Sequence, residues 1–420
     1  MMALWSVVAA FGAYFCMYAF RKPFTAADYL ETDCWGVDFK TVLVVTQVLG
    51  YATSKFIGIK VIAEMTPRWR ALSILVLIGL AHLALLCFAL IPPPYNAPAL
   101  FVNGLMLGMV FGLVLGFLEG RCLTEALSAG LCASFILADG ATKSIGAQLL
   151  LLGISPFWMP FAAGAVFVLP LLLFVGMLSR IPPPSHTDVT ARSERVPMNA
   201  DARAKFFRRY GWGLGALVAM YLMITVLRSM RADFAPEIWQ GLGYTQQPSI
   251  FFISEIFVAL GVVVVNGLSV LIRDNRRAFF LSLGVSAGGL ILVGLSLGLN
   301  NFGAVNGFGF MVLVGLGLYL PYVAVHTTVF ERLIAMTRDR GNIGYLLYLA
   351  DAFGYLGYVV VLLTKTLARP EGNFLQFFML ACGVIAMLAL VGVAFCWHFF
   401  RSYSIVAEQE ATIRIAEVNG

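Results

Sequence analysis

Charged residues are scarce in this chain of 420 residues: 12% are Asp, Glu, Lys or Arg, whereas 60% are hydrophobic. A soluble domain needs about 25% charged residues to cover its surface. The shortage of charge excludes an ordinary soluble domain and, with a mean hydropathy of +0.88, indicates a membrane protein. Apolar stretches such as 72–91 are continuous and do not alternate as barrel strands do, so the spans are expected to be helices.

Cysteine is also rare, with seven residues and no CxxC spacing. The sequence therefore favours neither a disulfide framework nor a metal cluster, and no cofactor is expected. It shows no nucleotide-binding motif and no catalytic triad, so we do not expect an enzyme. A basic N-terminal region with a cleavage site is lacking too, so the first span is expected to remain in the mature chain.

Hydropathy and helix-breaking residues predict twelve helical spans. Their ranges are 3–28, 41–63, 71–91, 98–118, 124–152, 157–178, 211–233, 248–272, 278–299, 303–331, 341–364 and 374–400. The sequence thus predicts an all-α membrane protein made of two pseudo-symmetric six-helix bundles. The predicted parts are an N-terminal bundle at 1–180, a basic cytoplasmic linker at 181–210, a C-terminal bundle at 211–400 and a cytoplasmic tail at 401–420.

The net charge of +6 comes mainly from the loops. Eighteen Lys and Arg residues lie in the C-terminal segment and in the loops after even-numbered spans, whereas three lie in the loops after odd-numbered spans. Because basic residues are enriched on the cytoplasmic side, both termini are expected in the cytoplasm, and the bacterial inner membrane is the expected location. The positive charge is thus a topology signal, and no nucleic-acid partner is expected.

Two basic residues at equivalent positions of the halves suggest a binding site. Tyr14 precedes Arg21 by seven residues, and Tyr221 precedes Arg228 by seven. Seven residues are two helical turns, so each tyrosine is predicted to share a face with its arginine. A charge in the hydrocarbon costs at least about 2.5 to 3.5 kcal/mol on insertion scales, so it needs a partner, a wet cavity or a ligand. As an alternative, Arg21 could snorkel to the interface.

Arginine is suited to phosphate because its planar fork donates two parallel hydrogen bonds and stays charged. Two arginines from opposite halves could therefore bind one doubly charged phosphoryl group and release it when the halves rock. In the second span, Tyr51 and Lys55 are one turn apart and share a polar stripe.

Other ionisable residues in the spans leave alternatives open. In the fifth span, Asp139 and Lys143 could neutralise each other or join the site. In the eleventh, Asp351 could carry a proton or form an ion pair. His326 in the tenth could relay protons or satisfy a local hydrogen bond.

Three segments resemble one transporter family: YFCMYAFRKPF at 14–24, YATSKFIG at 51–58 and LRSMRADFAP at 227–236. They are similar to the organophosphate:phosphate antiporters of the major facilitator superfamily, which include the glycerol-phosphate and hexose-phosphate carriers. The family carries a histidine where this chain has Lys143. Residues and resemblance together predict a substrate-binding set of Arg21, Arg228, Lys55, Lys143, Tyr14, Tyr18, Tyr51, Tyr319 and Tyr355. The residues expected to act in gating or proton movement are Asp139, Asp233, Glu255, His326 and Asp351.

The resemblance implies secondary active transport of a phosphorylated small organic anion by alternating access, in exchange for inorganic phosphate. One alternative is a proton-coupled symporter of another organic anion. A second is a transporter-like membrane sensor. The expected partners are the anion, phosphate or a proton as the coupling species, and the lipid bilayer, with a monomer as the expected state.

Overall fold

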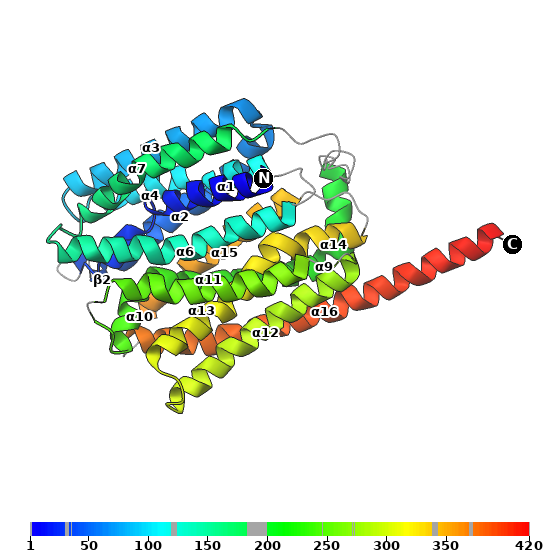
Figure 1. Ribbon diagram of the computed structural model, residues 1–420. Coiled ribbons are helices and arrows are strands. Elements are labelled where there is room, and N and C mark those ends of the chain that lie inside the picture. The colour runs from blue at the N-terminus through cyan, green and yellow to red at the C-terminus, as the bar shows by residue number, and fades with distance from the viewer. Residues whose placement is uncertain are drawn as a thin grey trace.

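Helices make up almost all of the described chain (Figure 1). The computed structural model describes residues 2–29, 33–34, 36–118, 124–182, 200–245, 247–270, 272, 274–337, 343–368 and 373–419. The first half holds α1 (Met2–Tyr18), the 3-10 helix η1 (Pro23–Ala26), α2 (Phe39–Glu64), α3 (Pro67–Leu90), α4 (Ala97–Leu107), α5 (Val110–Leu118), α6 (Thr124–Leu151) and α7 (Met159–Ser179). Two short strands, β1 (Asp33–Cys34) and β2 (Val37–Asp38), form an antiparallel pair before α2.

The second half continues the helical pattern. Its elements are α9 (Ala200–Asp233), α10 (Ala235–Gly241), α11 (Ser249–Val270), α12 (Asn275–Asn301), α13 (Gly307–Ala324), the π-helix η2 (Val325–Val329), α14 (Phe330–Thr337), α15 (Ile343–Ala368) and α16 (Phe374–Asn419). Of the predicted linker at 181–210, the structure describes residues 181–182 and the helical start of α9, and residues 183–199 lie outside the described residues. The predicted tail at 401–420 is helical as far as Asn419, where α16 ends. This last part of α16 projects well beyond the other helices (Figure 1).

Nine helical segments in the described ranges are long and apolar enough to cross a membrane. The apolar part of α1, Leu4–Tyr18, is shorter, and α2 and α6, which carry buried charges, are not among the nine. The chain is therefore an integral multi-pass membrane protein. Each of the twelve predicted ranges contains helix, while the count of twelve spans stays a prediction.

Most large helix contacts lie within one half of the chain. In the first half, α2 packs on α4, and α1 packs on α6 and α7. In the second half, α12 packs on α13, and α9 packs on α16 and α15. Two of these large contacts join the halves: α6 lies along α11 (Figure 1), and α2 packs on α15. These two seams bring together the polar side chains of both halves.

The packing of α2 on α4 depends on two glycines. A Cβ atom on Gly50 would lie 2.1 Å from the carbonyl oxygen of Phe101, and one on Gly104 would lie 2.1 Å from the carbonyl oxygen of Gln47. Only glycine allows such an approach of one backbone to another. The contact fixes how far α2 stands from α4, and so where α2 presents its polar stripe.

The first predicted span, 3–28, is not one continuous helix. Helix α1 ends at Tyr18, a turn follows at 19–22, and η1 begins at Pro23. Proline has no backbone N–H, and its ring clashes with the carbonyl group four residues earlier, so Pro23 disfavours continuation of the helix through this point. The prediction that Tyr14 and Arg21 share a helical face is therefore wrong, because the helix ends between them.

Side-chain amides satisfy the backbone at this break. The Asn103 amide donates to the Phe20 carbonyl at 2.9 Å, and the Gln47 amide donates to the Arg21 carbonyl at 2.9 Å. The two amides also bond each other at 2.8 Å, and Asn103 donates to the Ala81 carbonyl at 3.0 Å. Irregular backbone at membrane depth needs such internal partners. The turn that carries Arg21 is thus held by α2 and α4.

Candidate functional site

Arg21 lies in the protein interior. It is 3% exposed, so it does not reach the interface as the snorkelling alternative required. Its guanidinium carbon lies 3.7 Å from the ring centre of Tyr51, with Tyr18 at 5.8 Å and Tyr355 at 5.7 Å. Its Nε has no hydrogen-bond partner. Among the described residues, no carboxylate pairs with Arg21.

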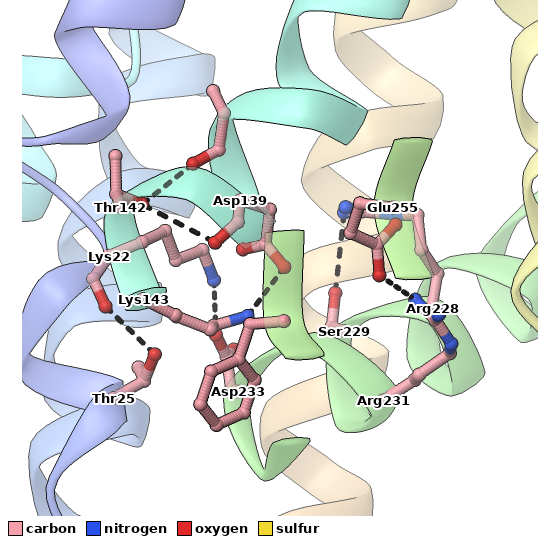
Figure 2. A network of polar contacts seen from close by, with 12 residues as sticks. Lys22, Thr25, Asp139, Thr142, Lys143, Arg228, Ser229, Arg231, Asp233 and Glu255 are labelled. Atoms are coloured by element: carbon pink, nitrogen blue, oxygen red, sulfur yellow. Dashed lines mark hydrogen bonds and ion pairs between the residues drawn. The ribbon is translucent and has the colours of Figure 1, made fainter. Parts of the chain in front are cut away.

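Arg228 on α9 has a similar environment in the second half. It is 5% exposed, and its guanidinium carbon lies 4.3 Å from the ring centre of Tyr322 and 5.9 Å from that of Tyr319. Its terminal nitrogen lies 3.4 Å from the hydroxyl oxygen of Ser229 (Figure 2), and its Nε has no partner. Like Arg21, it faces aromatic rings and no carboxylate in the described part of the chain.

Shared tyrosines connect the two arginines. Tyr18 and Tyr355 lie within electrostatic range of both guanidinium groups. The rings of Tyr51 and Tyr355 meet edge to face across the α2–α15 seam, with 4.9 Å between centres, and Tyr14 packs on Tyr18 at 5.6 Å. A ring face attracts a guanidinium by about 0.5 to 2 kcal/mol. A guanidinium that contacts ring faces can still direct its in-plane N–H donors to a flat or tetrahedral anion.

A buried ion pair joins the halves next to this region. The Lys22 ammonium pairs with the Asp233 carboxylate (Figure 2), and the two side chains are 7% and 2% exposed. A second ion pair between the halves joins Lys40 of α2 to Glu237 of α10 at 2.5 Å. Sequence reasoning selected Asp233 but missed Lys22 and Lys40 as partners, because each ion pair crosses about half of the chain.

The other predicted acidic residues in Figure 2 are also paired. Lys143 and Asp139 neutralise each other at 2.5 Å across one turn of α6, and Arg231 pairs with Glu255 at 2.7 Å. All four line a cavity of about 10 Å³, which holds one water molecule at most. The Lys143–Asp139 pair therefore fits the neutralising alternative in this conformation.

The remaining predicted residues meet where α2 approaches α15. Lys55 pairs with Asp351 at 2.9 Å, and the hydroxyl of Tyr221 donates to the same carboxylate. His326, on η2, places its Nε2 3.6 Å from Asp351. The predicted stripe of Tyr51 and Lys55 thus contacts the second half through both residues.

Charge pairing separates two arginines from all other buried basic residues. Seven basic residues are buried in the part of the chain that the structure describes: Arg21, Lys22, Lys40, Lys55, Lys143, Arg228 and Arg231. Five of them have a carboxylate oxygen within 4.0 Å. Among the residues that the structure describes, Arg21 and Arg228 have no such partner. Because an unpaired buried charge is costly, these two guanidinium groups form the strongest candidate anion site.

The chain matches one family along most of its length. Residues 23–403 match a family of unknown function, DUF5690. The chain belongs to this family. No curated protein matches this DUF5690 chain.

A solved structure gives the fold. The crystal structure of a D-xylose–proton symporter is similar, with a TM-score of 0.62 and 14% identity over 94% of this chain and 96% of that one. At this identity the likeness shows the fold alone: the chain has the helical membrane fold of that transporter, and the predicted all-α membrane class is confirmed, while the arrangement in two six-helix bundles stays a prediction.

Proposed function

We propose that this DUF5690 protein is a secondary active transporter for a phosphorylated small organic anion. Arg21 and Arg228 hold the phosphoryl group between the halves. The observation that carries the proposal is the pairing pattern: five of the seven buried basic residues in the described ranges have carboxylate partners, and these two do not. A phosphoryl group with two negative charges would balance two guanidinium groups.

The surroundings of the two arginines support an anion with hydroxyl groups or rings. Tyr18, Tyr51, Tyr319, Tyr322 and Tyr355 contribute rings within 6 Å of one guanidinium carbon or the other. Tyrosine offers an apolar face and a hydroxyl that can donate or accept. In this proposal the arginines bind the phosphoryl group, and the tyrosines contact the organic part.

Transport would proceed by alternating access between two six-helix bundles of a twelve-span fold. The ion pairs Lys22–Asp233 and Lys55–Asp351 join the two halves, so opening must separate or exchange them. Inorganic phosphate serves as the counter-ion in the exchange mode that the sequence resemblance implies. The proposed setting is the bacterial inner membrane, with a monomer and cytoplasmic termini.

The test replaces each arginine with lysine. Arg21→Lys and Arg228→Lys keep the charge but remove the fork. Losing one hydrogen bond to a charged group costs about 1.5 to 3 kcal/mol, which corresponds to roughly 10- to 150-fold weaker binding. Arg231→Lys is the matched control, because Arg231 lies three residues from Arg228 on the same helix and already pairs with Glu255.

Two measurements decide the proposal. Inorganic phosphate and phosphate esters should raise the thermal unfolding temperature of the purified protein, and phosphate-loaded liposomes should show counterflow of labelled phosphate. Both signals should persist in Arg231→Lys and be strongly reduced in the other two variants. Wild-type signals in Arg21→Lys and Arg228→Lys would refute the clamp. Phosphate binding without flux would instead favour the sensor.

A further inference from the structure

Asp351 is the point where four elements of the structure meet. From α2, the Lys55 ammonium reaches one carboxylate oxygen at 2.9 Å. From α9, the Tyr221 hydroxyl donates to the other oxygen. From η2, the Nε2 atom of His326 lies 3.6 Å from that second oxygen and 3.4 Å from the Tyr221 hydroxyl. All four side chains are buried.

The hydrogen bonds of His326 fix which ring nitrogen carries the hydrogen in the neutral form. Its Nδ1 lies 3.1 Å from the backbone carbonyl of Tyr322. A carbonyl only accepts, so Nδ1 must carry the hydrogen. Nε2 then carries a lone pair that faces a carboxylate oxygen of Asp351. The hydroxyl hydrogen of Tyr221 points to the same carboxylate. The π-helical turn at Val325–Val329 holds the ring in this place, and such turns are common at functional sites.

We infer that the gap between Nε2 of His326 and the carboxylate of Asp351 is a binding site for one proton, which the carrier takes together with its anion. A hydronium ion gives its proton to the Nε2 lone pair and leaves as water. The repulsion between the lone pair and the carboxylate is thereby replaced by a charged hydrogen bond. The coupling to an anion rests on the proposed function, whereas the proton site itself rests on this geometry.

A bound proton changes the contact between the halves. The single negative charge of Asp351 would then be shared between Lys55 and an imidazolium, so the ion pair joining α2 to α15 would weaken. Protonation therefore favours separation of the helices at this seam.

The site also senses the anion. The titratable or charged groups around the His326–Asp351 pair are Tyr51 and Lys55 from α2, Cys132 from α6, Tyr221 and Arg228 from α9, Tyr322 from α13, and Tyr348 from α15. Arg228 and Lys55 oppose a positive charge on His326. An anion that neutralises Arg228 removes part of that opposition. Anion and proton should thus bind cooperatively, and each must raise the affinity for the other equally.

Nuclear magnetic resonance of nitrogen-15-labelled histidine tests the proton site without a substrate. The chain has four histidines, and His326→Gln identifies the signal of His326 by subtraction. We expect a single Nδ1–H form at pH 8 and protonation of both ring nitrogens at pH 5.5. Asp351→Asn should abolish the doubly protonated form at pH 5.5. A neutral His326 at pH 5.5 in the wild type, or an unchanged signal in Asp351→Asn, would overturn the inference.

Liposomes test the coupling, with inorganic phosphate as the probe. The measured quantity is phosphate uptake with the outside acidic, divided by uptake at equal pH. The ratio should exceed one in the wild type and fall to one in His326→Gln. His82→Gln is the matched control, since His82 is a second histidine within a span, stacks on Phe161 at 4.4 Å, and should keep the wild-type ratio.

The two proposals fail in different ways. A wild-type ratio of one with measurable phosphate uptake would refute proton coupling and leave the anion carrier intact. If phosphate neither binds nor moves under any gradient, the proposed function fails, while the histidine spectra still decide the proton site.

Discussion

The ion pair between Lys22 and Asp233 makes a quantitative prediction about closure between the halves. Lys22→Met removes the positive partner and leaves a carboxylate that is 2% exposed. Removing one partner of a buried pair costs about 3 to 5 kcal/mol. In an open conformation water solvates Asp233, so the cost falls on the closed conformation alone. The population of the open form should rise roughly 150- to 5,000-fold.

Hydrogen–deuterium exchange measures the change in the open population without an attached probe. Helix α10 of the second half packs on η1 of the first half. Separation of the halves exposes the backbone amides of both elements. Where exchange proceeds through this opening, its rate should rise by the same factor as the open population. The double variant Lys22→Met, Asp233→Leu should return close to wild type, since no charge is then left unpaired.

The second ion pair between the halves, Lys40–Glu237, supplies the control. Lys40→Met leaves Glu237, which is 22% exposed and can reach water, so its effect should be smaller than that of Lys22→Met. Acceleration of less than about tenfold in Lys22→Met, or equal effects of the two variants, would refute the assignment of closure to the buried pair.

Two further predictions concern the frame that holds Arg21. Asn103→Leu removes the amide that donates to two buried carbonyl groups, so it should cost about 2 to 6 kcal/mol and lower the thermal unfolding temperature of the purified protein. Gly104→Ala should also lower it, because the new Cβ would lie 2.1 Å from the Gln47 carbonyl. Gly79→Ala in α3 meets nothing within 4 Å and should leave that temperature unchanged or raise it. A stable Gly104→Ala protein would contradict the close packing of α2 on α4.

The sequence was sufficient to predict the class of fold and the presence of Arg21 and Arg228 within the helical region, where both are buried. Hydropathy marks the helices, and a charge in an apolar run is visible without a structure. The pairing of charges was not predictable, because partners such as Lys22 and Asp233 are 211 residues apart. Spacing along one helix was enough to predict the Lys143–Asp139 pair, whose members lie one turn apart. It could not predict pairs whose members are far apart in the sequence.

Aromatic partners show the same limit. Tyr322 has the ring closest to Arg228, yet tyrosine in a span is common enough that sequence reasoning passed over it. Its position four residues before His326 was the available signal, because that spacing puts both on one face. Pro23 likewise marked the end of the first helix, but the amides of Asn103 and Gln47 that stabilise the break come from other helices.

Because helix α1 ends at Tyr18, the backbone that carries Arg21 differs from the backbone that carries Arg228. Arg228 projects from the last two turns of a long regular helix, whereas Arg21 lies on a short irregular turn held by two amide side chains. Small changes in that turn, or in the amides beneath it, would move Arg21 and leave Arg228 where it is, which would change the spacing of the proposed clamp. Under the proposed function, selectivity among anions of different size could therefore diverge within the family through residues that do not contact the bound anion.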